Sequence, residues 1–282
     1  MKTKSTVPEA IVFLFAHLYM YNISSYIMLT EESSTDTLMS VKMSIAKIII
    51  GIVALFFTHY FTNVSIKRLL FSCNPLPTAT IISIVAILWL TITLITKSSV
   101  SFTTSQWISF TLGNLAIGIF EEFVSRIGVL WILLKKWHRN QKDLFKVCLV
   151  SGFMFGIAHL PNLFNGNEVR NVIIQVITAS FIGTLLGIIY LRTFNIWCCV
   201  LIHAFYDYTV FLTRYSKYQS FKLPSDASTQ TLSLNNFGFI IISILTFVGL
   251  FALSFVILQK LLNKSASKKI LSKVNTFLRN TK

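Results

Sequence analysis

The sequence contains few charged residues for its length. Only 12% of its 282 residues are Asp, Glu, Lys or Arg, whereas soluble domains contain about 25%, and its mean hydropathy is +0.69. Apolar runs longer than the ~18 residues needed to span a bilayer recur along the chain. This composition argues against a soluble domain with a large core and predicts a polytopic membrane protein.

Cysteine and several common catalytic motifs are also scarce or missing. The chain has no HExxH, GxSxG or GxxxxGK[ST] sequence. The helix of the common zinc proteases, the serine elbow and the phosphate-binding loop are therefore absent. The four cysteines show no paired spacing and three lie in apolar runs, so we expect buried small side chains rather than metal ligands or disulfides. They are Cys73, Cys148, Cys198 and Cys199.

The net charge of +15 does not indicate a nucleic-acid partner. The basic residues cluster in short loops and in the tail after Lys260, where they determine topology and contact anionic lipid. No basic recognition helix or base-stacking module is evident. We therefore expect contact with the lipid bilayer and no binding to nucleic acid.

Eight apolar spans predict an all-α bundle of about eight transmembrane helices. The first is read as a retained span, because a basic start leads into a long apolar stretch without a small-residue cleavage site. Basic residues at alternate links predict a multi-pass protein of the cell membrane with both termini in the cytoplasm. The predicted spans are 9–29, 45–63, 79–96, 106–134, 144–163, 169–191, 195–214 and 237–259.

The chain divides into three parts on this reading. Residues 1–105 are N-terminal transmembrane helices, residues 106–214 form a core that holds most of the intramembrane ionisable groups, and residues 215–282 are the last helix and a basic cytoplasmic tail. No separate soluble domain, internal repeat or low-complexity tract is evident.

Three ionisable side chains lie within the fourth span. Each costs about 2.5–3.5 kcal/mol at the bilayer centre on insertion scales, so it must be paired, protonated or directed at a polar cavity. Glu122 and Arg126 are four residues apart and can form a charge pair, whereas Glu121 lies about 100° around the helix. We expect Glu122 and Arg126 to hold a site and Glu121 to perform chemistry. The alternative is that all three form one neutral packing network.

Arg126, in the fourth span, is interpreted as the only basic residue deep within a span. The fifth span contributes a histidine. His159 follows Phe155 by four residues, so the two share a helical face. Gly152 and Gly156 are also four apart, which predicts close contact with another helix.

The seventh span adds a second histidine, and a proline marks the end of the fifth. His203 and Asp207 are four residues apart and project together. Asp207 can orient the imidazole, or both groups can donate hydrogen bonds to a developing oxyanion when the acid is protonated. Pro161 predicts that the fifth helix stops near it.

Three motifs in this order resemble those of the CPBP family, the group of CAAX prenyl endopeptidases and bacteriocin-processing enzymes also called Abi proteins. The resemblance covers roughly residues 106–214 and departs from the pattern only slightly, since Ile127 separates Gly128 from the arginine. It implies a membrane-embedded endopeptidase of the glutamate type. The motifs are EExxxR (Glu121, Glu122, Arg126), FxxxH (Phe155, His159) and HxxxD (His203, Asp207).

The resemblance also implies roles for these residues. Glu121 would be the general base that activates water, assisted by His159. His203 and Asp207 would stabilise the oxyanion, while the supporting residues are Glu122, Arg126 and Phe155. We favour a reaction that requires no cofactor; the alternative is a zinc ion bound by Glu121, His159 and His203.

The expected substrate is a peptide or a membrane-associated protein. The Lys-, Ile- and Asn-rich composition favours an AT-rich bacterial genome, so a bacteriocin, a pheromone precursor or self-immunity to such a peptide fits better than a prenylated protein. One alternative is a non-catalytic membrane scaffold or immunity protein that retains the motif residues for structure. The hypothesis of a proton-coupled transporter is weakened, because the sequence shows no repeated halves and no discontinuous spans.

Overall fold

The computed structural model describes residues 41–96, 102–164, 167–221, 256, 260 and 262–279. All elements in these ranges are helical, which confirms the all-α prediction. The predicted spans 9–29 and 237–259 lie outside the described residues, apart from Val256.

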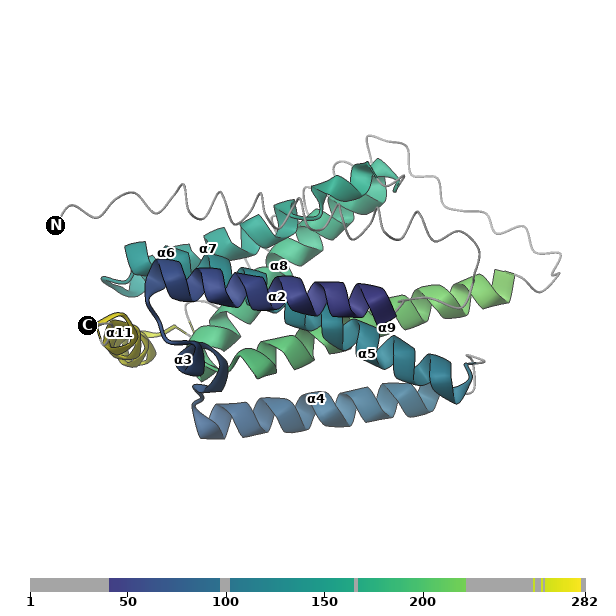
Figure 1. Ribbon diagram of the computed structural model, residues 1–282, viewed down its shortest axis with the longest axis horizontal. Coiled ribbons are helices and arrows are strands. Elements are labelled where there is room, and N and C mark those ends of the chain that lie inside the picture. Colours follow the sequence, from purple (N-terminus) through teal and green to yellow (C-terminus); the bar gives the residue numbers. More distant parts are fainter. Residues whose placement is uncertain are drawn as a thin grey trace.

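The long helices lie roughly along the longest axis of the molecule (Figure 1). Four of the described helices are long and apolar enough to cross a membrane, namely Ser44–Thr62, Thr78–Ile95, Gln141–Leu163 and Val169–Thr193. A shorter apolar stretch is Ile196–Leu212. The elements are α2 (Val41–Thr62), α3 (Ile66–Phe71), α4 (Pro75–Thr96), α5 (Thr104–Glu122), η1 (Phe123–Leu130), α6 (Trp131–Lys136), α7 (Gln141–Ile157), η2 (Leu160–Leu163), α8 (Val169–Thr193), α9 (Ile196–Phe221) and α11 (Lys264–Arg279).

The predicted fourth span is a continuous helical rod made of α5, η1 and α6. It begins at a capping box, in which the Thr103 hydroxyl accepts from the backbone N–H of Gln106 and the Gln106 side chain accepts from the N–H of Thr103. The middle segment, η1, is a π-helix with all eight of its residues buried. Such segments are rare and occur frequently at functional sites, and this one starts directly after Glu122.

The helices α7 and α8 pack at very short range through glycines. A Cβ atom added at Gly152 would lie 2.5 Å from the backbone nitrogen of Thr184, and one added at Gly156 would lie 2.5 Å from the carbonyl oxygen of Val176. No side chain fits at either place, so the predicted close contact is confirmed. The predicted end of the fifth span is confirmed as well, because α7 ends at Ile157 and Pro161 lies in the short 3₁₀ segment η2.

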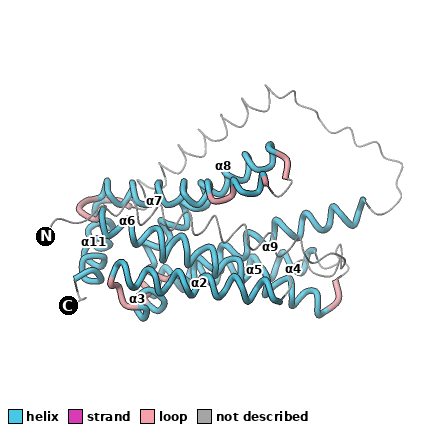
Figure 2. Tube along the Cα trace, turned by 45° about the horizontal axis from the view of Figure 1, so that its top comes forward, coloured by secondary structure: helices cyan, strands magenta, loops and turns pink. Residues whose placement is uncertain are grey.

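The basic elements gather at one end of the bundle. The elements α3, α6 and α11 lie there in both views (Figures 1 and 2), and α11 is seen end-on in Figure 1, across the direction of the long helices. The Phe277 ring of α11 stacks on Trp131, with ring centroids 5.8 Å apart. Lys273 of α11 lies 3.1 Å from the side-chain oxygen of Asn74 in the α3–α4 link. The amphipathic helix α11 is thus fixed across this end.

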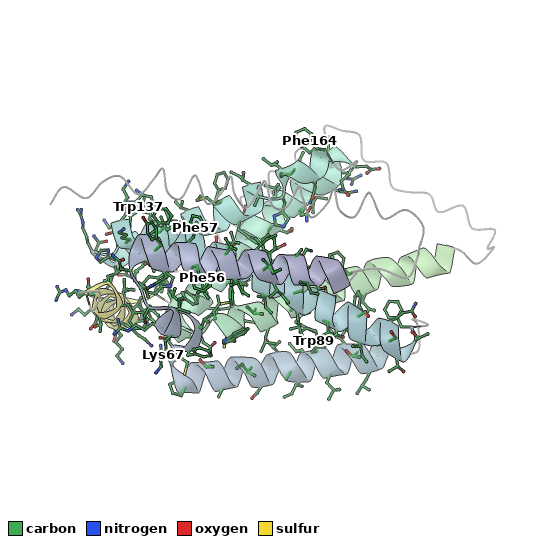
Figure 3. All side chains as sticks on the ribbon, viewed as in Figure 1. Phe56, Phe57, Lys67, Trp89, Trp137 and Phe164 are labelled. Carbon is green, nitrogen blue, oxygen red and sulfur yellow. The ribbon has the colours of Figure 1, made fainter. Side chains whose placement is uncertain are left out.

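The helices α2 and α4 present apolar side chains to the outside. Phe56 and Phe57 of α2, labelled in Figure 3, are 57% and 48% exposed. Ile87 and Leu90 of α4 are 64% and 61% exposed. Large apolar side chains exposed along whole helices suit contact with lipid chains, as expected for a multi-pass membrane protein.

Candidate active site

The two adjacent glutamates lie at the junction of α5 and η1, and both are buried. Arg126 of η1 lies one turn beyond Glu122 and has no exposed surface. Its Nε atom is 2.9 Å from Oε2 of Glu122, and its Nη2 atom donates to Oε1 at 3.1 Å. The predicted pairing of Glu122 with Arg126 is therefore present in the structure.

The imidazole of His203 on α9 contacts the same carboxylate. Its Nδ1 atom lies 2.7 Å from Oε1 of Glu122. Because a carboxylate oxygen accepts, this contact places the proton on Nδ1 and fixes the plane of the ring. The orienting role that the sequence allowed for Asp207 therefore belongs to Glu122.

The other ring nitrogen of His203 faces two further acids. Its Nε2 atom is 3.4 Å from Oε2 of Glu121 and 3.6 Å from Oδ2 of Asp207. The two adjacent glutamates thus lie next to opposite nitrogens of one imidazole. This division agrees with the angular separation of Glu121 and Glu122 on the helix.

A glycine brings α5 and α9 close enough for these contacts. A Cβ atom added at Gly118 would lie 2.8 Å from the carbonyl oxygen of Val200 and 3.2 Å from the Cβ of Ala204. Gly118 lies one helical turn before Glu121, and Ala204 follows His203. The absent side chain at Gly118 therefore sets the distance between the carboxylates and the imidazole.

The FxxxH motif adds an aromatic ring that touches three of the polar groups. The Phe155 ring lies edge-on to His159 and to His203, with ring centroids 5.1 and 5.5 Å away. The central guanidinium carbon of Arg126 is 5.3 Å from the centre of the same ring. Phe155 therefore packs between the two histidines and the arginine, which fits a supporting residue.

His159 lies just beyond the end of α7, where it precedes η2. The side chain is buried, and its Nδ1 atom is 3.0 Å from the carbonyl oxygen of Phe155. This contact holds the ring beside the rest of the site. The structure thus gathers the seven motif residues from α5, η1, α7 and α9 into one group.

Lys47 is a buried basic residue that the sequence analysis did not single out. Lys47 lies on α2, is 9% exposed, and interacts electrostatically with Glu121 and Asp207. It lies near the start of the predicted span 45–63, and hydropathy alone does not single it out there. The useful signal was its spacing of four residues from Gly51, which puts both on one helix face.

The donor groups do not fit a metal ion. Among the residues that the structure describes, no set of three or more His, Cys, Asp and Glu side chains is arranged to hold one. The zinc set considered from the sequence was Glu121, His159 and His203, and both histidine rings of this set pack edge-on against Phe155. The described side chains therefore offer acid and base groups rather than a set of metal ligands.

A known protein family matches the segment of the chain that holds these site residues. Residues 103–209 match a family model described as type II CAAX prenyl endopeptidase Rce1-like. The match runs from the N-cap of α5 into α9 and contains all seven motif residues. No curated protein and no solved structure matches the chain. The segment 103–209 of this multi-pass membrane protein belongs to the CAAX protease (CPBP) family.

Proposed function

We propose that the protein is a glutamate-type endopeptidase that hydrolyses a peptide bond within the membrane. The observation that carries this proposal is the meeting of Glu121 and Asp207 at one nitrogen of His203, while Glu122 holds the other nitrogen. A base and two groups able to stabilise an oxyanion then lie around one point. This arrangement is what hydrolysis of an amide requires.

The reaction begins with the activation of water by Glu121. The carboxylate takes one proton from the water, and the water oxygen attacks the carbonyl carbon of the scissile bond. His159 assists by helping to position the water. The carbonyl oxygen becomes an oxyanion, which accepts hydrogen bonds from the Nε2–H of His203, protonated on both ring nitrogens, and from protonated Asp207.

The second step breaks the carbon–nitrogen bond. Glu121 passes its proton to the leaving nitrogen, the carbonyl re-forms, and the products are a carboxylic acid and an amine. Throughout, Glu122 and Arg126 keep the His203 ring in one orientation. Phe155 excludes water from the space between the histidines.

The substrate is a membrane-associated protein or a small peptide precursor. A cavity of about 590 Å³ lies between α4, α5 and α9, lined by Trp89, Trp107 and Tyr208 among others, and Tyr208 directly follows Asp207 in the chain. Its apolar and aromatic lining suits the apolar part of a membrane-bound substrate. A bacteriocin or pheromone precursor, or a peptide to which the cell is immune, fits this description.

The test is cleavage by protein purified in detergent. The probes are a fluorogenic peptide ending in a prenylated CAAX sequence and a fluorogenic peptide carrying a bacteriocin-type leader. We expect Glu121→Gln to abolish cleavage, and the exposed Glu168→Gln, a change of the same type at the start of α8, to leave it unchanged.

A thermal unfolding curve of each variant shows whether the fold is retained. If wild type and Glu121→Gln cleave equally well, the assignment of the base is wrong. If Glu121→Gln retains the biological activity of the wild type in cells, the protein is a scaffold or immunity protein rather than a protease.

A further inference from the structure

The turn between α6 and α7 carries a concentration of positive charge. Residues 135–146 contain five basic residues and one acid, Asp143. The Asp143 carboxylate accepts the backbone N–H of Arg139 at 2.9 Å and so helps to close the turn. None of the five basic side chains forms an ion pair with an acid in the described ranges. Four of them are exposed and Lys136 is half-buried; the five are Lys135, Lys136, Arg139, Lys142 and Lys146.

Two of these ammonium groups share one indole ring. The Nζ atom of Lys146 lies 4.0 Å from the centre of the Trp137 ring, and the Nζ atom of Lys136 lies 5.6 Å from it. The two Nζ atoms are therefore within about 10 Å of each other, which is about one Debye length at 0.1 M salt. Salt screens their repulsion only in part, so an anion bound between them is attracted to both.

An apolar surface adjoins this turn. The Lys135 ammonium donates to the carbonyl oxygen of Phe61 near the end of α2, which fixes the turn beside that helix. The Phe61 ring contacts those of Phe57 and Tyr60, with centroids 6.0 and 5.3 Å away. Phe57 and Tyr60 are 48% and 77% exposed, and Figure 3 shows Phe57 and Trp137 at the same end of the molecule. Positive charge and exposed aromatic rings thus meet at the basic end.

This combination matches a phospholipid with a negatively charged headgroup. The apolar helix Gln141–Leu163 is long enough to cross a membrane and begins at this turn, which places the turn at the membrane surface. Trp and Tyr side chains are typical of that level, where an apolar ring meets lipid and its polar group meets water. Basic residues beside a spanning helix are attracted to the anionic lipids of the cytoplasmic leaflet, and the sequence predicts that this end is cytoplasmic. A free anion uses only the charges, whereas the exposed rings of α2 suit an acyl chain.

We propose that the α6–α7 turn and the end of α2 form a binding site for one anionic phospholipid. The lipid phosphate lies between Lys136 and Lys146, the headgroup lies beside Trp137, and an acyl chain runs along Phe57 and Tyr60. None of these residues belongs to the proposed catalytic group, so the inference goes beyond the proposed function. It holds whether or not the protein cleaves a peptide.

The first test measures lipid binding to the full chain in detergent by native mass spectrometry. The probes are phosphatidylglycerol, which is anionic, and phosphatidylcholine, which has no net charge. We expect wild type to retain phosphatidylglycerol in preference to phosphatidylcholine. The double variant Lys136→Gln/Lys146→Gln should bind phosphatidylglycerol about tenfold more weakly or worse, because it loses two cations at the membrane surface.

The matched control is Lys268→Gln/Lys269→Gln. It removes the same charge from exposed positions of α11 at the same end of the molecule, and it should retain the lipid as wild type does. Equal losses in the two double variants overturn the proposal, because they indicate a diffuse attraction to the whole basic end. A wild type without preference for phosphatidylglycerol also overturns it.

A competition separates a lipid site from a site for a free anion. Inorganic phosphate added in excess over the lipid should displace little phosphatidylglycerol, because it makes no contact with the exposed rings of α2. Complete displacement by phosphate overturns the assignment to a lipid.

A second measurement locates the bound lipid. Phosphatidylglycerol with brominated acyl chains should quench the tryptophan fluorescence of the protein in phosphatidylcholine vesicles more strongly than brominated phosphatidylcholine does. Trp137→Phe should remove most of that difference, and Lys136→Gln/Lys146→Gln should reduce it. If the difference survives Trp137→Phe unchanged, the anionic lipid binds elsewhere and the proposal is wrong. Thermal unfolding curves of the variants show whether each retains its fold.

Discussion

The Nδ1 atom of His203 lies 2.7 Å from Oε1 of Glu122, the same oxygen that accepts from Arg126. One buried carboxylate thus joins η1 to α9 and fixes both the guanidinium and the imidazole. Glu122 has no exposed surface, so water cannot replace these bonds if the carboxylate is removed. The charge pair and the orientation of the histidine depend on one side chain.

Replacing Glu122 by Gln should therefore impair stability as well as activity. The change leaves the Arg126 charge buried without its counter-ion, and breaking a buried pair in this way costs about 3–5 kcal/mol. The double variant Glu122→Gln/Arg126→Met removes both charges and should unfold at a higher temperature than Glu122→Gln alone. Thermal unfolding in detergent measures both effects. A Glu122→Gln protein as stable as wild type would show that Arg126 is not held by this carboxylate.

The glycines of α7 provide a second prediction, about packing. Gly152→Ala places a methyl group against the side chain and backbone of Thr184, and such overpacking typically costs about 1–3 kcal/mol. Because Phe155 follows on the same helix, its ring should shift away from the histidines and the cleavage rate should fall. The unfolding midpoint and kcat measure the two consequences.

Gly187→Ala on α8 is the matched control for this change. Its added Cβ would lie 3.4 Å from the nearest side-chain atom, Cδ1 of Leu130, which can give slightly. Similar losses in Gly152→Ala and Gly187→Ala would mean that the α7–α8 distance does not position the site.

The local parts of the site could be predicted from the sequence because helical spacing determines them. Glu122 and Arg126 pair across one turn, and Gly152 and Gly156 allow a close helix contact. Pro161 marks the region where α7 has already ended. Each of these features depends on residues within one helix.

The parts that could not be predicted depend on contacts between helices. Glu122 orients His203 only because Gly118 lets α5 approach α9, and the spacing of His203 and Asp207 pointed to Asp207 instead. Lys47 joins the site because α2 packs on α5 through Gly51. Hydropathy says which segments are buried in a membrane, but it does not say which of their faces meet.

Cysteine accessibility tests the predicted orientation. Cys73 is exposed in the link between α3 and α4, at the basic end, whereas Cys148, Cys198 and Cys199 are buried. If this end faces the cytoplasm, a membrane-impermeant maleimide should label Cys73 in inverted membrane vesicles and not in intact cells. Mass spectrometry of the labelled protein identifies the modified residue.

An added cysteine at the other end completes this experiment. Phe164 follows η2, is 87% exposed and lies away from Lys67 and Trp137 of the basic end (Figure 3). A Phe164→Cys variant should be labelled in intact cells. Labelling of Cys73 in intact cells and of the added cysteine only in inverted vesicles would reverse the predicted topology.

Chelation tests the choice between the two hydrolytic mechanisms. The described acids and histidines are not arranged to hold a metal ion, and Nδ1 of His203 already contacts Glu122. We therefore expect the purified enzyme to retain its cleavage rate after prolonged dialysis against 1,10-phenanthroline, with no gain when zinc is restored. Elemental analysis of the same sample should find no metal in proportion to protein. If activity is lost on chelation and returns with zinc, while Glu121→Gln, His159→Ala and His203→Ala each lower the bound zinc, those side chains rearrange around a metal and the water is activated by the ion instead of Glu121.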